Sequence, residues 1–390
     1  MSNAQSAIVA ATIADDVYAL TKQLTKEDAL RLLNRLYKGS FSFADDNLLT
    51  AKTGGPPGFK ISTGFGFVLL GKKAPYKGHA FIVFRGTQLL ADWLTNGHIA
   101  TSRSESGHLV HGGFHNTFNT MKPRLKDFVN VINQPRHGIH TVHCVGHSLG
   151  GALATLCANW VSTSKSTYLY TFGSPRTGLA SFAENITQKL NSENIFRAYH
   201  KTDPVPKLLP WPYTHVPFSG GDYYLPSPGS NFSATYHGMD MYIATIKREG
   251  NWPQLKGFVE EKKTDFGIAR WLESKETNSL TVTVVGWLEQ ALVWVLKKCL
   301  GAAHTALAGL VGGSITLIDK LAYILAKGVN LAENISYWVL LFIKKLMQVL
   351  GMPFVSDKLE MSQNFIRSVM VRLQREVTIA SQQALMQKIG

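Results

Sequence analysis

Alternating apolar and mixed segments occupy the first two-thirds of the chain and predict strands separated by helices. Apolar runs of strand length occur at residues 65–70, 80–84, 141–145 and 167–172. Segments that favour helix, through their periodicity or their small residues, lie at residues 14–38, 118–132 and 150–161. Strands alternating with helices are typical of a mostly parallel sheet covered by helices. We therefore expect an α/β fold in this part of the chain.

The composition changes near residue 254. Of the 15 prolines only Pro353 lies beyond that point, and much of the chain there is apolar. The stretch from Cys299 to Ile318 lacks Asp, Glu, Lys and Arg and is about as long as a minimal bilayer span. We predict an α/β domain over residues 1–255 and an apolar all-α C-terminal extension over residues 256–390. These helices either lie at a membrane interface or bury their apolar faces against the first domain or in an oligomer.

The formal net charge of +14 favours anionic partners. No Lys/Arg-dense run or nucleic-acid-binding signature is present, so we expect no nucleic acid partner and favour a membrane surface. The three cysteines argue against a disulfide-stapled exported domain. Met1 to Leu20 has no basic residue before its apolar stretch, unlike an ordinary signal peptide. We expect cytoplasmic synthesis, followed by membrane association or export through a non-classical route.

The segment Val145-Gly-His-Ser-Leu-Gly-Gly151 contains G-x-S-x-G between a predicted strand and a predicted helix. Such a serine sits on a sharp turn, and glycine is required at Gly146 and Gly150 because a Cβ there would collide with neighbouring elements. The turn exposes the serine Oγ and directs the helix N-terminus toward a developing oxyanion. The segment therefore predicts that Ser148 is the nucleophile of an acyl hydrolase.

A serine nucleophile needs a histidine base and a carboxylate that orients this base, in the chain order serine, acid, histidine. Asp203 precedes two prolines that would stiffen its loop, and His237 lies at the start of a predicted helix. The rival acids are Asp222 and Asp240. His215 competes as the base, whereas His200 precedes Asp203 and is disfavoured. His147 is expected to be structural.

Five ordered motifs cover roughly residues 65–245. They are Phe84-Arg-Gly-Thr87 with Asp92-Trp93-Leu94, His111-Gly-Gly-Phe114, Gly146-His-Ser-Leu-Gly-Gly-Ala152, Thr171-Phe-Gly-Ser-Pro-Arg-Thr-Gly178 and Asp203-Pro-Val-Pro206. Together they resemble the class 3 lipases, the fungal-lipase-like family of α/β-hydrolases. The segment Tyr213-Thr-His215 resembles that family's non-catalytic histidine. The resemblance implies an α/β-hydrolase fold, with Ser148 as nucleophile, His237 as base and Asp203 as the acid that orients it.

The resemblance also implies an oxyanion hole and a lid. Thr87 and the backbone N–H of Leu149 are the implied oxyanion donors. A segment near residues 88–107 is expected to form a lid that swings onto a lipid surface, with Leu89, Trp93 and Leu94 on its apolar face. A static amphipathic segment is the alternative interpretation.

These features predict a lipolytic carboxylic-ester hydrolase that works through an acyl-serine intermediate, without metal or cofactor. We favour a phospholipase A-type enzyme acting at membranes, because the charge is basic and the extension is apolar. A triacylglycerol or small-ester lipase is the alternative enzyme. A membrane-inserting or membrane-binding protein that acts through its C-terminal helices is the alternative of another class. The sequence identifies no inhibitory or delivery partner.

Overall fold

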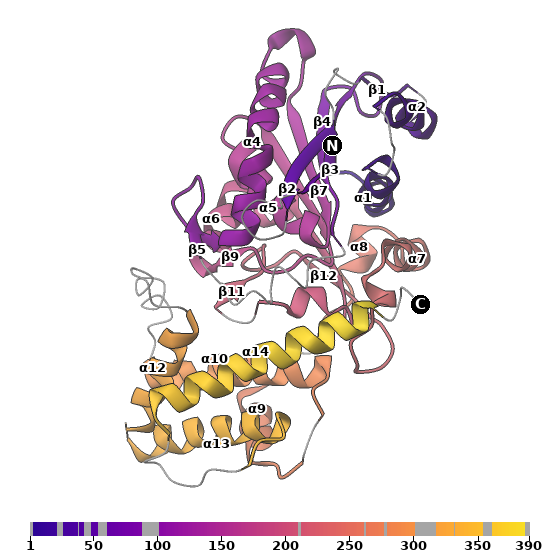
Figure 1. Ribbon diagram of the computed structural model, residues 1–390. Coiled ribbons are helices and arrows are strands. Elements are labelled where there is room, and N and C mark those ends of the chain that lie inside the picture. The colour runs from indigo at the N-terminus through magenta and orange to yellow at the C-terminus, as the bar shows by residue number, and fades with distance from the viewer. Residues whose placement is uncertain are drawn as a thin grey trace.

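The computed structural model describes most of the chain in twelve segments. They are residues 3–21, 26–37, 39–42, 48–53, 61–87, 101–209, 212–260, 263–276, 279–300, 317–330, 332–353 and 361–386. Figure 1 shows two units, one built around a sheet and one built only from helices.

The larger sheet is mostly parallel and carries the site at its carboxyl edge. Its described strands are β1 (Phe41–Ser42), β2 (Leu48–Thr53), β3 (Ile61–Gly71), β4 (His79–Phe84), β7 (Thr141–His147), β8 (Ser166–Phe172), β10 (Ile195–His200) and β12 (Asp222–Leu225). Their order is β1-β3-β4-β7-β8-β10-β12, with β2 paired to β3. The pairs from β4 to β12 are parallel, whereas β3 is antiparallel to its three neighbours. In this register Phe84, Gly146 and Thr171 lie side by side, so three strands end around the turn that carries Ser148.

Helices cover both faces of this sheet. They are α1 (Ala7–Thr21), α2 (Lys26–Tyr37), α4 (Gly112–Ile132), α5 (Leu149–Val161), α6 (Ala180–Leu190), α7 (Met239–Glu249) and α8 (Trp252–Leu255). One apolar core lies against α4, α5 and α6, and the other against α1, α7 and α8. This layered arrangement confirms the predicted α/β-hydrolase fold (Figure 1).

Short elements complete this unit. A smaller sheet has the order β11-β9-β6-β5, and its strands are β5 (Thr101–Arg103), β6 (Leu109–His111), β9 (Gly178–Leu179) and β11 (Tyr213–Thr214). The 3₁₀ helices are η1 (Pro135–His137), η2 (Ser192–Asn194), η3 (Val205–Lys207) and η4 (Thr235–His237).

Two predicted helices differ from the structure in their bounds. The expected helix at residues 14–38 is two helices, α1 and α2, and α1 begins at Ala7. The start of α1 consists of small residues that are buried on several sides, such as Ala10 and Ala11, so it lacks the amphipathic period that marks a surface helix. The expected helix at residues 118–132 begins instead at Gly112, because the His111 side chain caps it by accepting the Phe114 N–H.

The C-terminal unit is helical, as predicted. It consists of α9 (Asp265–Glu273), α10 (Val282–Leu300), α12 (Leu317–Val329), α13 (Glu333–Val349) and α14 (Gln363–Met386). These helices share a core of their own. In the sheet unit the last member of the nearby core is Leu255, and the first member of the helical core is Ile268. We keep a boundary at residues 255 and 256 as a proposal that these separate cores support.

The two units are joined by a partly buried ion pair. The Arg176 guanidinium donates to both carboxylate oxygens of Glu289 on α10, at 2.7 and 2.9 Å, and also to the Leu209 carbonyl at 2.9 Å. Figure 1 shows α14 (yellow) running along the boundary between the units, and Leu385 of α14 packs against a core of the sheet unit. The segment that follows Asp203 is thereby tied to the helical unit.

We expect Glu289→Ala to lower the free energy of unfolding by about 3 kcal/mol, because it leaves the Arg176 charge largely buried without its carboxylate. The two side chains are only 11% and 17% exposed. The matched control is Asp319→Ala, which breaks the more exposed pair with Arg367 and should cost at most about 1 kcal/mol. Urea unfolding of the full chain measures both values, and equal losses would contradict the role given to the Arg176–Glu289 pair.

Candidate active site

Ser148 occupies a strained turn between β7 and α5. Its backbone angles are φ 58° and ψ −132°, a conformation that L residues rarely adopt. A Cβ on Gly146 would lie 2.1 Å from the Gly150 carbonyl oxygen, and one on Gly150 would lie 2.2 Å from the Phe84 carbonyl oxygen. Both glycines of the motif are therefore required by close backbone packing, as the sequence indicated.

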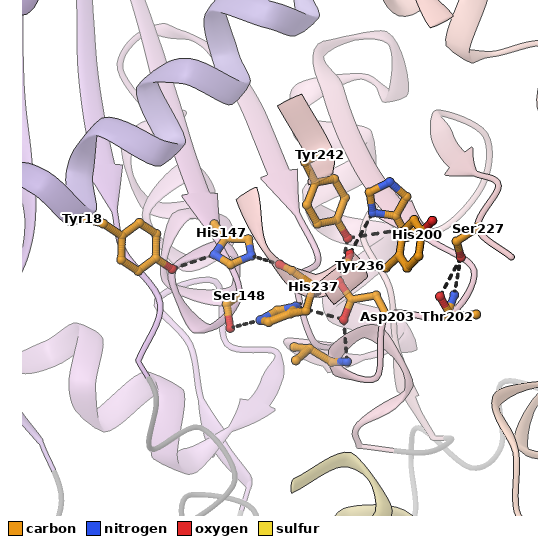
Figure 2. Close-up of polar contacts among 11 residues, drawn as sticks. Tyr18, His147, Ser148, His200, Thr202, Asp203, Ser227, Tyr236, His237 and Tyr242 are labelled. Carbon is orange, nitrogen blue, oxygen red and sulfur yellow. Dashed lines mark hydrogen bonds and ion pairs between the residues drawn. The ribbon is translucent and has the colours of Figure 1, made fainter. Parts of the chain in front are cut away.

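The structure brings Ser148, His237 and Asp203 into one line of hydrogen bonds. The His237 Nε2 lies 3.0 Å from the Ser148 Oγ, and the His237 Nδ1 lies 2.9 and 3.0 Å from the two Asp203 oxygens (Figure 2). His237 is the last residue of η4 and is separated from α7 by Gly238, and Asp203 lies between β10 and η3. Three loops at the carboxyl edge of the sheet thus converge on one point.

Asp203 is fully buried and its oxygens are occupied by donors. Besides His237, the Val205 N–H donates to Oδ1 at 2.9 Å and the Tyr242 hydroxyl donates to Oδ2 at 2.7 Å. Burial, and then the neighbouring Asp203 carboxylate, raise the pKa of Tyr242 well above its ordinary value, so the hydroxyl keeps its proton and donates. Buried charge is tolerated here because donors surround it.

Gly173 is a site residue whose function the sequence did not reveal. It has φ +55°, and a Cβ there would lie 2.5 Å from the Asp203 Oδ2 and 3.1 Å from the His237 Nδ1. The glycine therefore leaves the space in which the acid meets the histidine. In the sequence, only its place within the motif Thr171–Gly178 indicates that Gly173 belongs to the site.

The rival residues lie elsewhere. His200 donates from Nδ1 to the Tyr236 carbonyl and pairs through Nε2 with the Thr245 hydroxyl, so its ring is committed away from Ser148. Asp222 pairs with Arg197, and Asp240 lies in the first turn of α7. Burial, followed by nearby Arg and Lys charges, lowers the pKa of His215 well below its ordinary value.

The proposed oxyanion donors flank the nucleophile. Leu149 is the first residue of α5, where backbone N–H groups have no partner within the helix. Thr87 follows β4, and the preceding Gly86 packs so closely that an added Cβ would lie 2.6 Å from the Ser148 Cβ. A carbonyl carbon attacked by Ser148 would place its oxygen near this edge, where such donors stabilise negative charge.

Comparison with known proteins places part of the chain near one family. Residues 81–213 match the sequence profile described as Lipase (class 3). Over this range the chain is similar to the class 3 lipases. The match includes Ser148 and Asp203, and His237 lies beyond it.

The chain is similar over part of its length to enzymes with different names. It is 34% identical over 129 residues to the Secreted mono- and diacylglycerol lipase 1 of Fusarium solani, covering 32% of this chain and 38% of that protein. It is 32% identical over 177 residues to the Secreted mono- and diacylglycerol lipase A of Penicillium camembertii, covering 44% and 55%. The Phospholipase A1-II 1 of Oryza sativa subsp. japonica is 24% identical over 268 residues, covering 59% and 66%. Only part of each relative is therefore matched.

Among solved structures, the chain is similar to the Rhizomucor miehei lipase propeptide complex. The TM-score is 0.38 at 23% identity, over 56% of this chain and 66% of that one.

The localisation expected from the sequence is wrong. Cytoplasmic synthesis with membrane association or non-classical export is contradicted by the matched relatives of Fusarium and Penicillium, which are named secreted lipases. The expectation rested on the composition of residues 1–20. Most of these residues form α1, whose buried side chains pack beneath the sheet, so their composition reflects packing in the core and carries no information on export.

The predicted lid falls largely outside the described residues. Leu89, Trp93 and Leu94 belong to this part. The described end of the range, residues 101–107, forms β5 and a turn. Glu105 of this turn contacts α4 through ion pairs with Lys122 and His115. A lid built on this segment would therefore have a fixed downstream end.

Two features that would indicate other functions are metal-binding clusters and membrane-spanning helices, and both concern the described segments here. These segments contain no cluster of three or more His, Cys, Asp or Glu side chains that could hold a metal ion. Among the helices of these segments, none combines the length and the hydropathy needed to cross a bilayer. Most of the Cys299–Ile318 stretch, residues 301–316, lies outside them.

We expect the protein to lose stability as the pH falls from about 6.5 to about 4. Burial lowers the pKa of both His111 and His200 to about 4, below the 6.5 of an exposed histidine. Between pH 6.5 and pH 4 the unfolded chain therefore binds protons that the folded chain does not bind. Each histidine thus contributes about 3 kcal/mol to the free energy of unfolding above pH 6.5, and this contribution is lost as the pH falls toward 4. Urea unfolding at pH 7.0 and pH 4.5 measures the loss. His200→Gln should reduce this difference, and an unchanged difference would contradict the assignment.

Proposed function

We propose that the chain is a lipolytic carboxylic-ester hydrolase with Ser148 as nucleophile, His237 as general base and then general acid, and Asp203 as the residue that orients His237. The supporting observation is the continuous hydrogen bonding from the Ser148 Oγ through both ring nitrogens of His237 to a buried carboxylate. This geometry meets the requirement for an activated serine.

The hydrogen bonds define the proton transfers. Asp203 accepts the Nδ1 proton of His237, so the Nε2 lone pair faces the Ser148 hydroxyl. As Oγ bonds to the ester carbonyl carbon, its proton moves to Nε2 and the carbonyl oxygen becomes an oxyanion. Nε2–H then protonates the departing alcohol, which leaves an acyl-serine. Water attacks the acyl-serine by the same two transfers and releases the carboxylic acid.

The backbone N–H of Leu149 and Thr87 would bind the oxyanion in both tetrahedral intermediates. The supporting observations are the position of Leu149 at the start of α5 and the close packing of Gly86 on Ser148. Losing one such donor typically slows acyl transfer by about 10²–10³.

The proposed substrates are acyl esters of glycerolipids, with action at a membrane surface. The names of the relatives, mono- and diacylglycerol lipase and phospholipase A1, support this substrate class. The net charge of +14 supports attraction to anionic phospholipid, so we favour phospholipase A-type action. Hydrolysis of mono- and diacylglycerols is the second candidate, because these lipases are the relatives with the higher identity.

Mass spectrometry of mixed phospholipid and diacylglycerol vesicles tests the proposal. We expect wild-type protein to release lysophospholipid and free fatty acid, and Ser148→Ala to release neither. Fatty acid from diacylglycerol alone would select the second candidate. Vesicle leakage caused equally by both proteins, without any released fatty acid, would contradict ester hydrolysis and favour a membrane-disrupting role for the C-terminal helices.

A further inference from the structure

Three partly buried hydrogen bonds lie beside Ser148 and begin at Tyr18 of α1. The Gly86 N–H donates to the Tyr18 hydroxyl oxygen at 2.9 Å, and this hydroxyl lies 2.6 Å from the His147 Nδ1. The other ring nitrogen of His147, Nε2, lies 2.7 Å from the backbone carbonyl oxygen of His237. Figure 2 shows Tyr18, His147 and His237 in this sequence, beside Ser148.

One assignment of protons along these three hydrogen bonds leaves His147 uncharged. The His237 carbonyl only accepts, so the His147 Nε2 carries a proton and donates it. The Tyr18 oxygen accepts from the Gly86 N–H, and we assign its own proton to the bond with the His147 Nδ1. With one nitrogen donating and the other accepting, the His147 ring is neutral.

The two ends of this hydrogen-bond network, Gly86 and His237, are parts of the proposed catalytic apparatus. Gly86 shares a peptide bond with Thr87, whose N–H is the proposed oxyanion donor. His237 supplies both the carbonyl that accepts from His147 and the ring that meets the Ser148 Oγ. A fixed carbonyl at His237 fixes the backbone from which this ring projects.

Close packing leaves the residues of this hydrogen-bond network little room to move. A Cβ on Gly86 would lie 2.7 Å from the Tyr18 hydroxyl as well as 2.6 Å from the Ser148 Cβ. The Tyr18 ring meets the His147 ring edge-on, with centroids 5.7 Å apart, and α1 packs into the core beneath the sheet. The helix therefore presents its hydroxyl from a rigid support.

We propose that Tyr18 and His147 are positioning residues that align the oxyanion peptide with His237 and keep an uncharged ring beside the catalytic imidazole. This inference rests on the proposed function and assigns a positioning role to α1, which lies outside the matched residues 81–213.

Charge explains why the neutral ring matters. The centroids of the His147 and His237 rings are 4.6 Å apart, and His237 becomes an imidazolium during each proton transfer. A cation on His147 would oppose that imidazolium. The ionisable groups near Tyr18 are Arg85 and Asp15. Those around His237 are Asp203, His200 and Tyr242. Burial raises the pKa of Tyr18, so its proton remains available to His147.

Tyr18→Phe tests the proposal, with Tyr37→Phe as its matched control. Tyr37 also buries a hydroxyl that bonds to α1, but it donates to the Asp16 carboxylate rather than to a residue of the site. On a soluble short-chain p-nitrophenyl ester, we expect Tyr18→Phe to lower kcat about tenfold with KM unchanged, and Tyr37→Phe to leave kcat unchanged. Melting temperatures of both variants measure the purely structural loss. Equal kcat losses in the two variants, or none in Tyr18→Phe, would overturn the proposal.

The pH profile separates a positioning role from a structural one. Without the Tyr18 proton donor, the His147 Nδ1 can bind a proton, so the acid limb of log kcat should steepen from a slope of one toward two. The double variant Tyr18→Phe/His147→Gln has no imidazole to titrate there, and its slope should return to one. An unchanged slope in Tyr18→Phe would contradict the neutral-ring role. Absence of Ser148-dependent activity in wild type would instead refute the proposed function.

Discussion

We expect alanine at Ser148 or at His237 to lower kcat for ester hydrolysis by about 10⁶, and the double variant to be no slower than either single variant. The losses do not multiply because the two residues act as one unit. Without His237 the Ser148 hydroxyl keeps its proton, and without Ser148 the histidine has nothing to activate. Steady-state rates on a soluble p-nitrophenyl ester measure all three variants.

The control for this prediction is His137→Ala, which removes a histidine in η1, outside the proposed site. We expect its kcat to match wild type. Multiplicative losses in the double variant would mean that Ser148 and His237 act independently, and a His237→Ala enzyme with a few per cent of wild-type activity would mean that another group is the base.

We expect Asp203→Asn to lower kcat by about 10⁴ and to keep the fold. A carboxylate accepts from the His237 Nδ1–H, the Tyr242 hydroxyl and the Val205 N–H together. An amide offers one accepting oxygen and a donating NH₂ group, so it can favour the wrong tautomer of His237, with a proton on Nε2 facing Ser148. The loss should therefore fall on kcat rather than on KM.

The comparison for Asp203 is Asp240→Asn, which changes a rival carboxylate three residues after His237 in the chain. Because Asp240 lies in the first turn of α7, its loss should cost stability slightly and leave kcat within about twofold. Circular dichroism of both variants checks the fold. If Asp240→Asn were the slower enzyme, the acid would be misassigned.

Local sequence features predicted the nucleophile turn and the core of the fold well. The strand at residues 141–145 and the helix at residues 150–161 were visible because apolar runs and small residues give short-range signals. The structure has β7 at Thr141–His147 and α5 at Leu149–Val161. The two glycines around Ser148 could be read because the turn itself demands them.

Contacts between distant segments could not be predicted in this way. The bond from Tyr18 to His147 joins residues 129 positions apart, and the pair of Arg176 with Glu289 joins residues 113 positions apart. Neither pair has a local pattern, because the geometry comes from packing α1 under the sheet and α10 beside η3. Gly173 has the same character, since its need for space exists only once Asp203 and His237 have met.

Covalent capture of the nucleophile tests the central claim most directly. Treating the full chain with a p-nitrophenyl alkylphosphonate and mapping its peptides by mass spectrometry locates the reactive group, because the phosphonate stays bonded to an activated serine. We predict one adduct, on Ser148, that forms far more slowly in His237→Ala and is absent in Ser148→Ala. An adduct on another residue, or ester hydrolysis by a protein that the phosphonate does not label, would contradict the account.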